Sequence, residues 1–195
     1  MIDNISSNLD TFFQQFENWC LWDIKFMLKL EDGSGNSLKP DRKTYNSRRP
    51  FVAATIFMCC AIDTLAAFRY GRKNNNVGKT FKDFIKAYFK VDITKSGKSY
   101  NEKHIYEGIR NALLHGYSLG KDLALGHTDK NHHLERSGER VIIDVFMLYY
   151  DLEAVYKKYK DELLEGKHIK EFKKRWDFAP LIKYISEENL KRATN

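Results

Sequence analysis

Apolar residues near the start of the chain recur at three- and four-residue steps, from Leu9 to Leu28. This spacing places them on one face of an amphipathic helix, which we expect to run from about residue 8 to about residue 30. The polar segment Glu31–Asn36, which contains two glycines, is expected to end this helix. A polar, basic loop then leads to Pro50, whose fixed φ suits the first turn of the next helix.

The stretch from Phe51 to Phe68 is nearly all apolar. Its length approaches the lower limit for a membrane span. Asp63 lies inside the stretch, however, and a charged side chain is costly in a bilayer. We therefore interpret this segment as the central buried helix of a soluble protein, ending near Gly71.

The remaining periodicity predicts shorter helices separated by loops. One has Phe81, Phe84 and Tyr88 on its apolar face. The next is expected to begin at a capping box of Ser99 and Glu102. Gly116 is a natural stop for this second helix, because glycine readily adopts the left-handed conformation of a helix C-terminus.

Residues 117–140 break the helical period, and a short hairpin is expected around Asp122–Glu135. A brief extended stretch at Val141–Ile143 precedes a long helix that Gly166 ends. Two short helices, over about residues 168–176 and 180–192, complete the expected order.

Composition supports one helical domain. Of the 195 residues, 43% are hydrophobic and 30% charged, which suffices for a core and a solvated surface. Three prolines and eleven glycines favour long helices over a many-stranded sandwich. The predicted fold class is all-α, a helical bundle with a short irregular or hairpin insert after the helix that ends at Gly116. We expect one domain over residues 1–195, with its core at about 50–165 and a C-terminal helical extension from about 167 to 195.

The net charge and the cysteines indicate the cellular compartment and the kind of partner. The 33 Lys and Arg outnumber the 26 Asp and Glu, and the formal charge of +7 favours encounters with polyanions such as RNA. The odd set of Cys20, Cys59 and Cys60 is typical of thiols in a reducing cytoplasm, and no Cys-x-x-Cys pair occurs. The polar N-terminus does not resemble a signal peptide. We therefore expect a cytoplasmic protein without a membrane partner.

The segment from Ile105 to Ser118 carries the most distinctive chemistry in the chain. Successive residues of an α-helix turn through about 100°, so each position can be placed around the helix. Measured from Ile109 on the apolar face, one polar stripe lies at about 200–240°. This stripe consists of His104, Asn111 and His115.

Arg110 lies on the flank between the apolar face and this stripe, at about 100°. A second copy of the helix facing the stripe, with Gly108 leaving room for close approach, would bring two His and two Arg side chains together. That arrangement suits phosphodiester chemistry, because imidazole moves protons and guanidinium binds phosphate. A simpler interpretation stays open: His115 complements the helix dipole, and Arg110 is merely solvated.

The sequence Arg110-Asn111-x3-His115 resembles the Arg-x(4–6)-His motif of the HEPN superfamily (higher eukaryotes and prokaryotes nucleotide-binding). A polar residue often follows the arginine in that family. The continuation to Tyr117 is similar to the Arg-x4-His-x-Tyr form of HEPN toxins that pair with minimal nucleotidyltransferases. The apolar helix containing Ala61-Ile62-Asp63 before the motif, and the long helix after it, also match the family's order. The resemblance covers about residues 50–165.

The resemblance implies a helical fold, a symmetric homodimer and cleavage of RNA at the shared interface, with no metal or other cofactor. Arg110, His115 and Asn111 would be catalytic, and Tyr117 would be a nearby site residue or a modification target. Attack of a ribose 2′-OH on the adjacent phosphate would leave a cyclic phosphate end. His104, from the polar stripe, is a further supporting candidate.

Three other patterns are weaker. Gly71 to Thr80 ends like a P-loop, but six residues separate its glycines where four are required, and a helix precedes it where a strand is needed. The lysines of the following helix are candidate contacts to RNA phosphates, although a solvated helix face explains them equally well. These are Lys79, Lys82 and Lys86.

A cluster of histidines with one aspartate lacks a closed zinc spacing and is better explained as a surface loop. Its members are His127, Asp129, His132 and His133.

Three functional hypotheses follow. The first is a metal-independent endoribonuclease of HEPN type acting as a homodimer, in defence or a stress response. The second is a non-catalytic module that binds nucleotides, RNA or a protein, with Arg110 only holding an anion. The third is the toxin of a two-protein system, in which a nucleotidyltransferase antitoxin silences the site through Tyr117.

Overall fold

The computed structural model describes residues 2–30, 50–126 and 132–179, and helix predominates in them. The N-terminal segments α1 (Ile2–Gln15), η1 (Phe16–Leu21) and α2 (Trp22–Met27) follow one another without a break, and η1 is a π-helix. They are followed by α3 (Phe51–Arg69), α4 (Val77–Tyr88), the π-helix η2 (His104–Asn111) and α5 (Ala112–Gly116). A small sheet leads into α6 (Val145–Leu164) and α7 (Ile169–Phe178).

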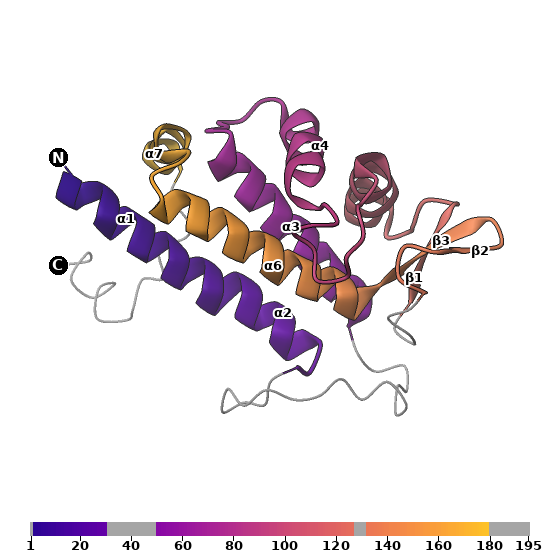
Figure 1. Cartoon of the computed structure of the whole chain (residues 1–195). Coiled ribbons are helices and arrows are strands. Elements are labelled where there is room, and N and C mark those ends of the chain that lie inside the picture. Colours follow the sequence, from indigo (N-terminus) through magenta and orange to yellow (C-terminus); the bar gives the residue numbers. More distant parts are fainter. Residues whose placement is uncertain (1, 31–49, 127–131, 180–195) are drawn as a thin grey trace, which may run out of the picture.

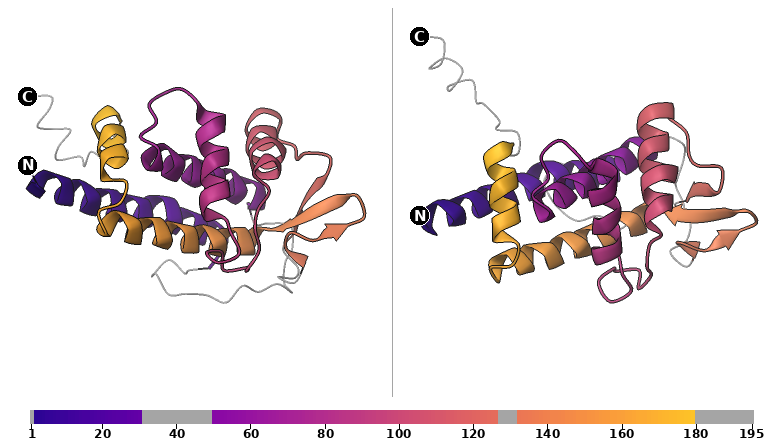
Figure 2. Two further views of the ribbon diagram at one scale, coloured as in Figure 1. Left: turned by 45° about the horizontal axis from the view of Figure 1, so that its top comes forward. Right: turned by 90° about the horizontal axis from the view of Figure 1, so that it is seen from above.

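The N-terminal helix and α6 run side by side along the length of the molecule (Figure 1). The ring of Phe16 stacks on that of Tyr156 with centroids 4.8 Å apart. The Tyr156 hydroxyl also donates a 2.8 Å hydrogen bond to Glu17. The sheet projects from one end of α6, and α7 stands at the other end (Figure 2).

Helix α3 is the central element, as its uniformly apolar sequence predicts. It contacts the N-terminal helix, α4, α6, α7 and the helix formed by η2 and α5. By length and mean hydropathy (2.0) alone it would pass for a membrane span, but more than half of its most apolar window is buried within the molecule. This burial fits the central core helix that the sequence predicted.

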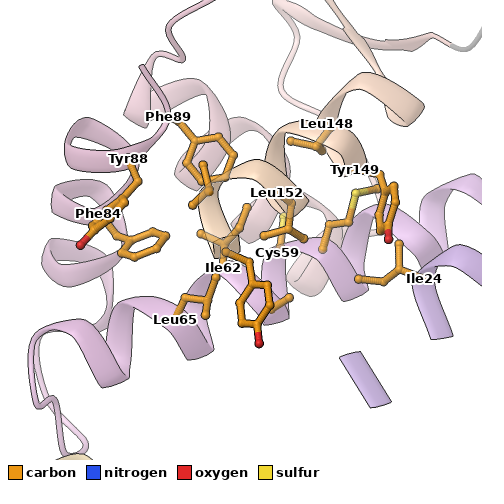
Figure 3. Packing of buried hydrophobic residues seen from close by; sticks show 14 of the residues in the cluster. Ile24, Cys59, Ile62, Leu65, Phe84, Tyr88, Phe89, Leu148, Tyr149 and Leu152 are labelled. Atoms are coloured by element: carbon orange, nitrogen blue, oxygen red, sulfur yellow. The ribbon is translucent and has the colours of Figure 1, made fainter. Parts of the chain in front are cut away.

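Buried side chains from α2, α3, α4 and α6 converge on one core (Figure 3). Ile62 and Leu65 of α3 lie at its centre and are fully buried. At the α7 end, aromatic rings join distant parts of the chain. The ring of Phe12 lies 4.5 Å from that of Phe68 and 5.3 Å from that of Phe172. The N-terminal helix and α7 therefore share the core with the segment between them.

The chain is mostly helical but not purely α. Strands β1 (Leu123–Gly126), β2 (Arg136–Ser137) and β3 (Arg140–Asp144) form a sheet in the order β1-β3-β2. The expected hairpin around residues 122–135 is wrong: β1 pairs in parallel with β3, and the antiparallel hairpin joins β2 to β3 through Gly138. Periodicity could not reveal this pairing, because a parallel partner lies far away along the chain.

Most predicted helix ends agree with the structure. Gly166, at φ 83°, follows α6, and α3 begins directly after Pro50. The capping box is wrong, however. The side chain of Asn101 accepts hydrogen bonds from the backbone N–H groups of Lys103 and His104, whereas Ser99 accepts one from Val91. The expected helix at 180–192 lies outside the described residues.

A buried polar network joins the sheet to the helices. Asp151, fully buried in α6, accepts hydrogen bonds of 2.6 Å from the backbone N–H and the hydroxyl of Ser96 and from the Tyr100 hydroxyl. The Tyr100 oxygen lies 2.7 Å from Nε2 of His133, whose Nδ1 accepts from the backbone N–H of Asp144. His133 is therefore a structural residue. Of the other members of the expected histidine cluster, His132 is exposed, and His127 and Asp129 lie outside the described residues.

Candidate functional site

The motif-bearing helix begins as the π-helix η2 and continues as α5 to Gly116. A π-helix has i→i+5 hydrogen bonds and therefore turns less per residue than an α-helix. The even 100° spacing assumed for the polar stripe does not hold between His104 and Asn111. His104 instead contacts Asp122, with Nε2 3.5 Å from Oδ2, while Asn111 bonds to Arg110. The structure thus does not gather the stripe into one cluster.

Arg110 lies between the motif helix and α3. Its Nη1 donates a 2.9 Å hydrogen bond to the side-chain oxygen of Asn111, and its guanidinium lies 5.6 Å from the centre of the Tyr106 ring. Its Nη2 lies 3.5 Å from the Oδ2 oxygen of Asp63 on α3. The side chain is 18% exposed. These contacts hold the guanidinium in one place beside α3.

Asp63 binds two arginines. Besides its ion pair with Arg110, its Oδ1 oxygen accepts a 2.6 Å hydrogen bond from Arg72 Nη1. The exposed Cys60 lies one turn before Asp63 on α3. The pKa of its thiol is raised, first by burial of part of the side chain and then by Asp63, while Arg110 acts in the opposite direction. The motif arginine is therefore part of a charged cluster on the surface of α3.

The Tyr106 ring, which lies against the Arg110 guanidinium, is itself tightly packed. A Cβ added at Gly78, in the first turn of α4, would lie 2.7 Å from the Tyr106 hydroxyl oxygen. The ammonium of Lys82 also lies 5.4 Å from the centre of this ring. Only glycine at position 78 leaves the ring its observed place, so α4 helps to position the motif arginine.

His115 lies in the last turn of α5 and is exposed. Within the described residues no hydrogen bond or ion pair joins it to Arg110 or to any other group. Tyr117 follows with φ 50°, a left-handed conformation that is costly for a residue other than glycine, and it is 74% exposed. Leu114 is exposed as well. The end of the motif helix thus presents a free imidazole between two exposed apolar side chains.

The room expected at Gly108 for a second copy is filled by the chain itself. The backbone N–H of Gly120 donates a 2.8 Å hydrogen bond to the Gly108 carbonyl. A Cβ added at Gly108 would lie only 2.4 Å from Cδ1 of Leu123. The small side of the helix at Gly108 thus packs against the segment leading into β1.

The hollows near the motif helix do not contain the motif pair. A pocket of about 440 Å³ is lined by His104, Gly108 and Asp122, among others. A larger one of about 620 Å³ lies between the N-terminal helix and α6, away from the motif. A third, of about 460 Å³, is lined by Leu113 and Tyr117, among others. Arg110 and His115 line none of these three pockets.

The three candidate lysines all have carboxylate partners. Lys79 binds Asp83 at 2.6 Å, Lys86 lies 3.1 Å from Glu102, and Lys82 lies 3.6 Å from Glu107. Exposed pairs of this kind contribute little stability, about 0–1 kcal/mol, so a phosphate can still compete for these lysines. The sequence predicted that these lysines lie on one helix, but it did not predict that each is paired with a carboxylate.

Sequence reasoning missed Asp63 and Tyr106 as partners of Arg110. A signal for Asp63 was present, since a carboxylate within an apolar helix is costly unless a cation pairs with it. That signal does not say which of the chain's many cations is the partner. Comparison with protein-family models, with curated proteins and with solved structures finds no match to this chain.

Proposed function

We propose that this chain is a metal-independent endoribonuclease of HEPN type, which cuts RNA at a homodimer interface in the cytoplasm. The observation that carries the proposal is the contrast between the two motif side chains. Arg110 is held in place by Asp63, Tyr106 and Asn111, whereas His115 is exposed and unpaired within the described residues. A positioned cation and a free proton carrier on one helix suit phosphodiester cleavage.

Arg110 retains donors for a phosphate. A guanidinium has five N–H donors, and in the described part of the chain only one of them forms a hydrogen bond, to Asn111. The 3.5 Å contact with Asp63 is an ion pair without a hydrogen bond, so the N–H groups of Nη2 remain able to donate to a phosphate oxygen. Asp63 and Asn111 then act as positioning residues for the guanidinium.

The reaction needs two proton transfers. As a ribose 2′-OH attacks the adjacent phosphorus, its proton passes to a base, and the departing 5′ oxygen takes up a proton from an acid. The products are a 2′,3′-cyclic phosphate and a 5′-OH end. Two copies of His115 would supply the base and the acid, and two copies of Arg110 would stabilise the charge on the phosphoryl oxygens.

The surface around His115 favours a partner chain. Leu114 and Tyr117 are exposed apolar side chains next to it, and Phe57 and Cys60 are exposed on α3, the helix that also carries Asp63. Tyr117 is additionally held in a strained backbone conformation, a feature that often accompanies functional positions. A symmetric dimer over this surface would bring both motif helices together.

A second candidate function rests on the burial of Arg110. Its side chain is only 18% exposed and is already paired with Asp63. In a non-catalytic module, Arg110 would anchor an RNA phosphate or a nucleotide and His115 would have no role in chemistry. A toxin silenced by a nucleotidyltransferase antitoxin through Tyr117 is a variant of the first proposal.

The test is incubation of the purified chain with mixed RNA in excess EDTA. The native chain should release fragments with cyclic phosphate ends, and His115→Ala should release none. His132→Ala is the matched control, because His132 is also exposed but lies outside the motif, and it should cleave like the native chain. Arg110→Lys should lose most activity, since an ammonium cannot reproduce the planar fork of donors.

Full activity of His115→Ala would refute the proposed mechanism. Absence of cleavage by every variant, combined with RNA binding that falls in Arg110→Gln but not in His115→Ala, would support the binding module instead. Sedimentation of the native chain tests the dimer separately from the chemistry.

A further inference from the structure

The loop between α3 and α4 forms a pocket that the proposed ribonuclease does not use. This pocket has a volume of about 420 Å³. Side chains of the loop, of the first turn of α4 and of α7 line it. Those that matter here are Arg72, Lys73, Asn75, Asn76, Thr80 and Lys174. They include the residues whose sequence looks like an imperfect P-loop.

The charge of this lining is entirely positive. Arg72, Lys73 and Lys174 contribute three cations, and among the described residues no carboxylate lines the pocket. The nearby carboxylates are already paired: Asp83 binds Lys79, and Asp63 binds Arg110 and Nη1 of Arg72, which leaves the other guanidinium nitrogens of Arg72 for a ligand. The amide side chains of the two asparagines add neutral hydrogen-bonding groups, and the Thr80 hydroxyl holds Arg72 in place by accepting a 3.0 Å hydrogen bond from its Nη1.

Two arginines beside the pocket have polar atoms without partners. The side chain of Arg72 is only 9% exposed, yet its buried Nε makes no hydrogen bond within the described residues. The buried Nε of Arg175 also makes no hydrogen bond within the described residues, and Nη1 of Arg175 donates to the carbonyls of Arg72 and Lys73. The pKa of Arg175 is lowered, first by burial and then by Arg72, so the two guanidinium groups repel each other. An anion bound in the pocket would place a negative charge beside Arg72 and so reduce this repulsion.

The loop is held firmly against α7. Gly71 is buried at φ 58°, and a Cβ there would meet the carbonyl oxygen of Glu171 at 3.0 Å and Cδ of Lys174 at 3.2 Å. The stem of Lys174 therefore passes over Gly71 on its way to the pocket. Asn76 adopts a left-handed conformation directly before α4, where the free N–H groups of a helix favour anions. The cations are thus brought together by backbone geometry.

We propose that this pocket binds the phosphoryl group of a small molecule, either free phosphate or the phosphate chain of a nucleotide. Arg72 and Lys174 bind the phosphoryl oxygens from two sides, and Lys73 closes the open edge. Neither Arg110 nor His115 lines this pocket, although Arg72 shares the Asp63 carboxylate with Arg110. The proposal does not depend on whether the chain cleaves RNA.

Isothermal titration of the full chain at low ionic strength tests the site, with inorganic phosphate, ATP and adenosine as probes. Phosphate and ATP should bind saturably and compete with each other, and adenosine should not bind. Lys174→Gln should weaken binding by roughly tenfold, the loss expected for one charge-assisted hydrogen bond. Lys173→Gln is the matched control, because Lys173 is exposed on the same helix but does not line the pocket.

The outcomes separate the two sources of the phosphoryl group. Tighter binding of ATP than of phosphate identifies a nucleotide, and equal binding identifies free phosphate. His115→Ala should bind both as the native chain does, which keeps this site distinct from the proposed ribonuclease site. Absence of saturable binding by the native chain, or equal losses in Lys174→Gln and Lys173→Gln, would overturn the proposal.

Discussion

The Tyr100 hydroxyl is the central link of the buried polar network, and its removal should destabilise the fold measurably. The backbone N–H of Asp144 donates to Nδ1 of His133, so the ring hydrogen must be on Nε2. That N–H donates to the Tyr100 oxygen, and the hydroxyl in turn donates to Asp151. Burial, followed by the charge of Asp151, raises the pKa of Tyr100 well above its ordinary value, so the hydroxyl keeps its proton.

The variant Tyr100→Phe keeps the ring and removes only this link. Nε2–H of His133 then lacks its acceptor, and Asp151 loses one of its three hydrogen-bond donors. A buried polar group left without a partner costs about 1–3 kcal/mol. Because Nε2 and the Oδ2 oxygen of Asp151 are only 3.6 Å apart, a small shift can restore part of the loss. We therefore expect a total cost of about 2–3 kcal/mol.

Urea unfolding followed by circular dichroism measures this cost. With a slope of about 2 kcal/mol per M, the midpoint should fall by about 1–1.5 M. Tyr117→Phe is the control, because that hydroxyl is on an exposed side chain, and its midpoint should stay within about 0.3 M of the native value. A Tyr100→Phe midpoint equally close to the native one would refute the reasoning, since it would mean that the network closes without the hydroxyl.

Three further predictions concern packing, charge and pH. Gly108→Ala should lower stability by about 1–3 kcal/mol in thermal unfolding, because its Cβ would collide with the buried side chain of Leu123; an unchanged melting temperature would contradict this packing. In Asp63→Asn, Arg72 and Arg110 lose their shared carboxylate, so urea unfolding should show a loss of about 2–3 kcal/mol and any RNA cleavage should be reduced. A variant as stable as the native chain would contradict this role of Asp63. Burial alone would raise the pKa of Glu17, but hydrogen bonds from Lys160 and Tyr156 lower it below 4.5. This carboxylate therefore stabilises the fold above pH 4.5 and loses that effect as the pH falls through its folded-state pKa. The free energy of unfolding should fall less on acidification in Glu17→Gln than in the native chain. Equal pH profiles of the two proteins would argue against the assignment.

Local patterns were sufficient for most of the helical framework. The uniformly apolar run of α3 predicts a central core helix, and more than half of it is buried, although Phe57 and Cys60 are exposed. The three- and four-residue spacing of α6 likewise predicts a helix packed against the core. Gly166 marks a helix end because glycine adopts the left-handed conformation observed there without strain, whereas after Gly116 it is Tyr117 that adopts this conformation. These signals operate within a few residues, so they can be read without the fold.

The candidate site depended on contacts between distant segments. Arg110 and His115 were singled out in the sequence by their resemblance to a family motif. The place of the arginine was decided by Asp63 on another helix and by a π-helical turn, which the local sequence does not predict. In the same way, β1 finds its parallel partner β3 only after the intervening chain has folded back. Sequence by itself determined which faces are apolar and where helices end, because those properties follow from neighbouring residues. Tertiary structure decided which charges pair and which segments meet, because those outcomes depend on packing across the whole core.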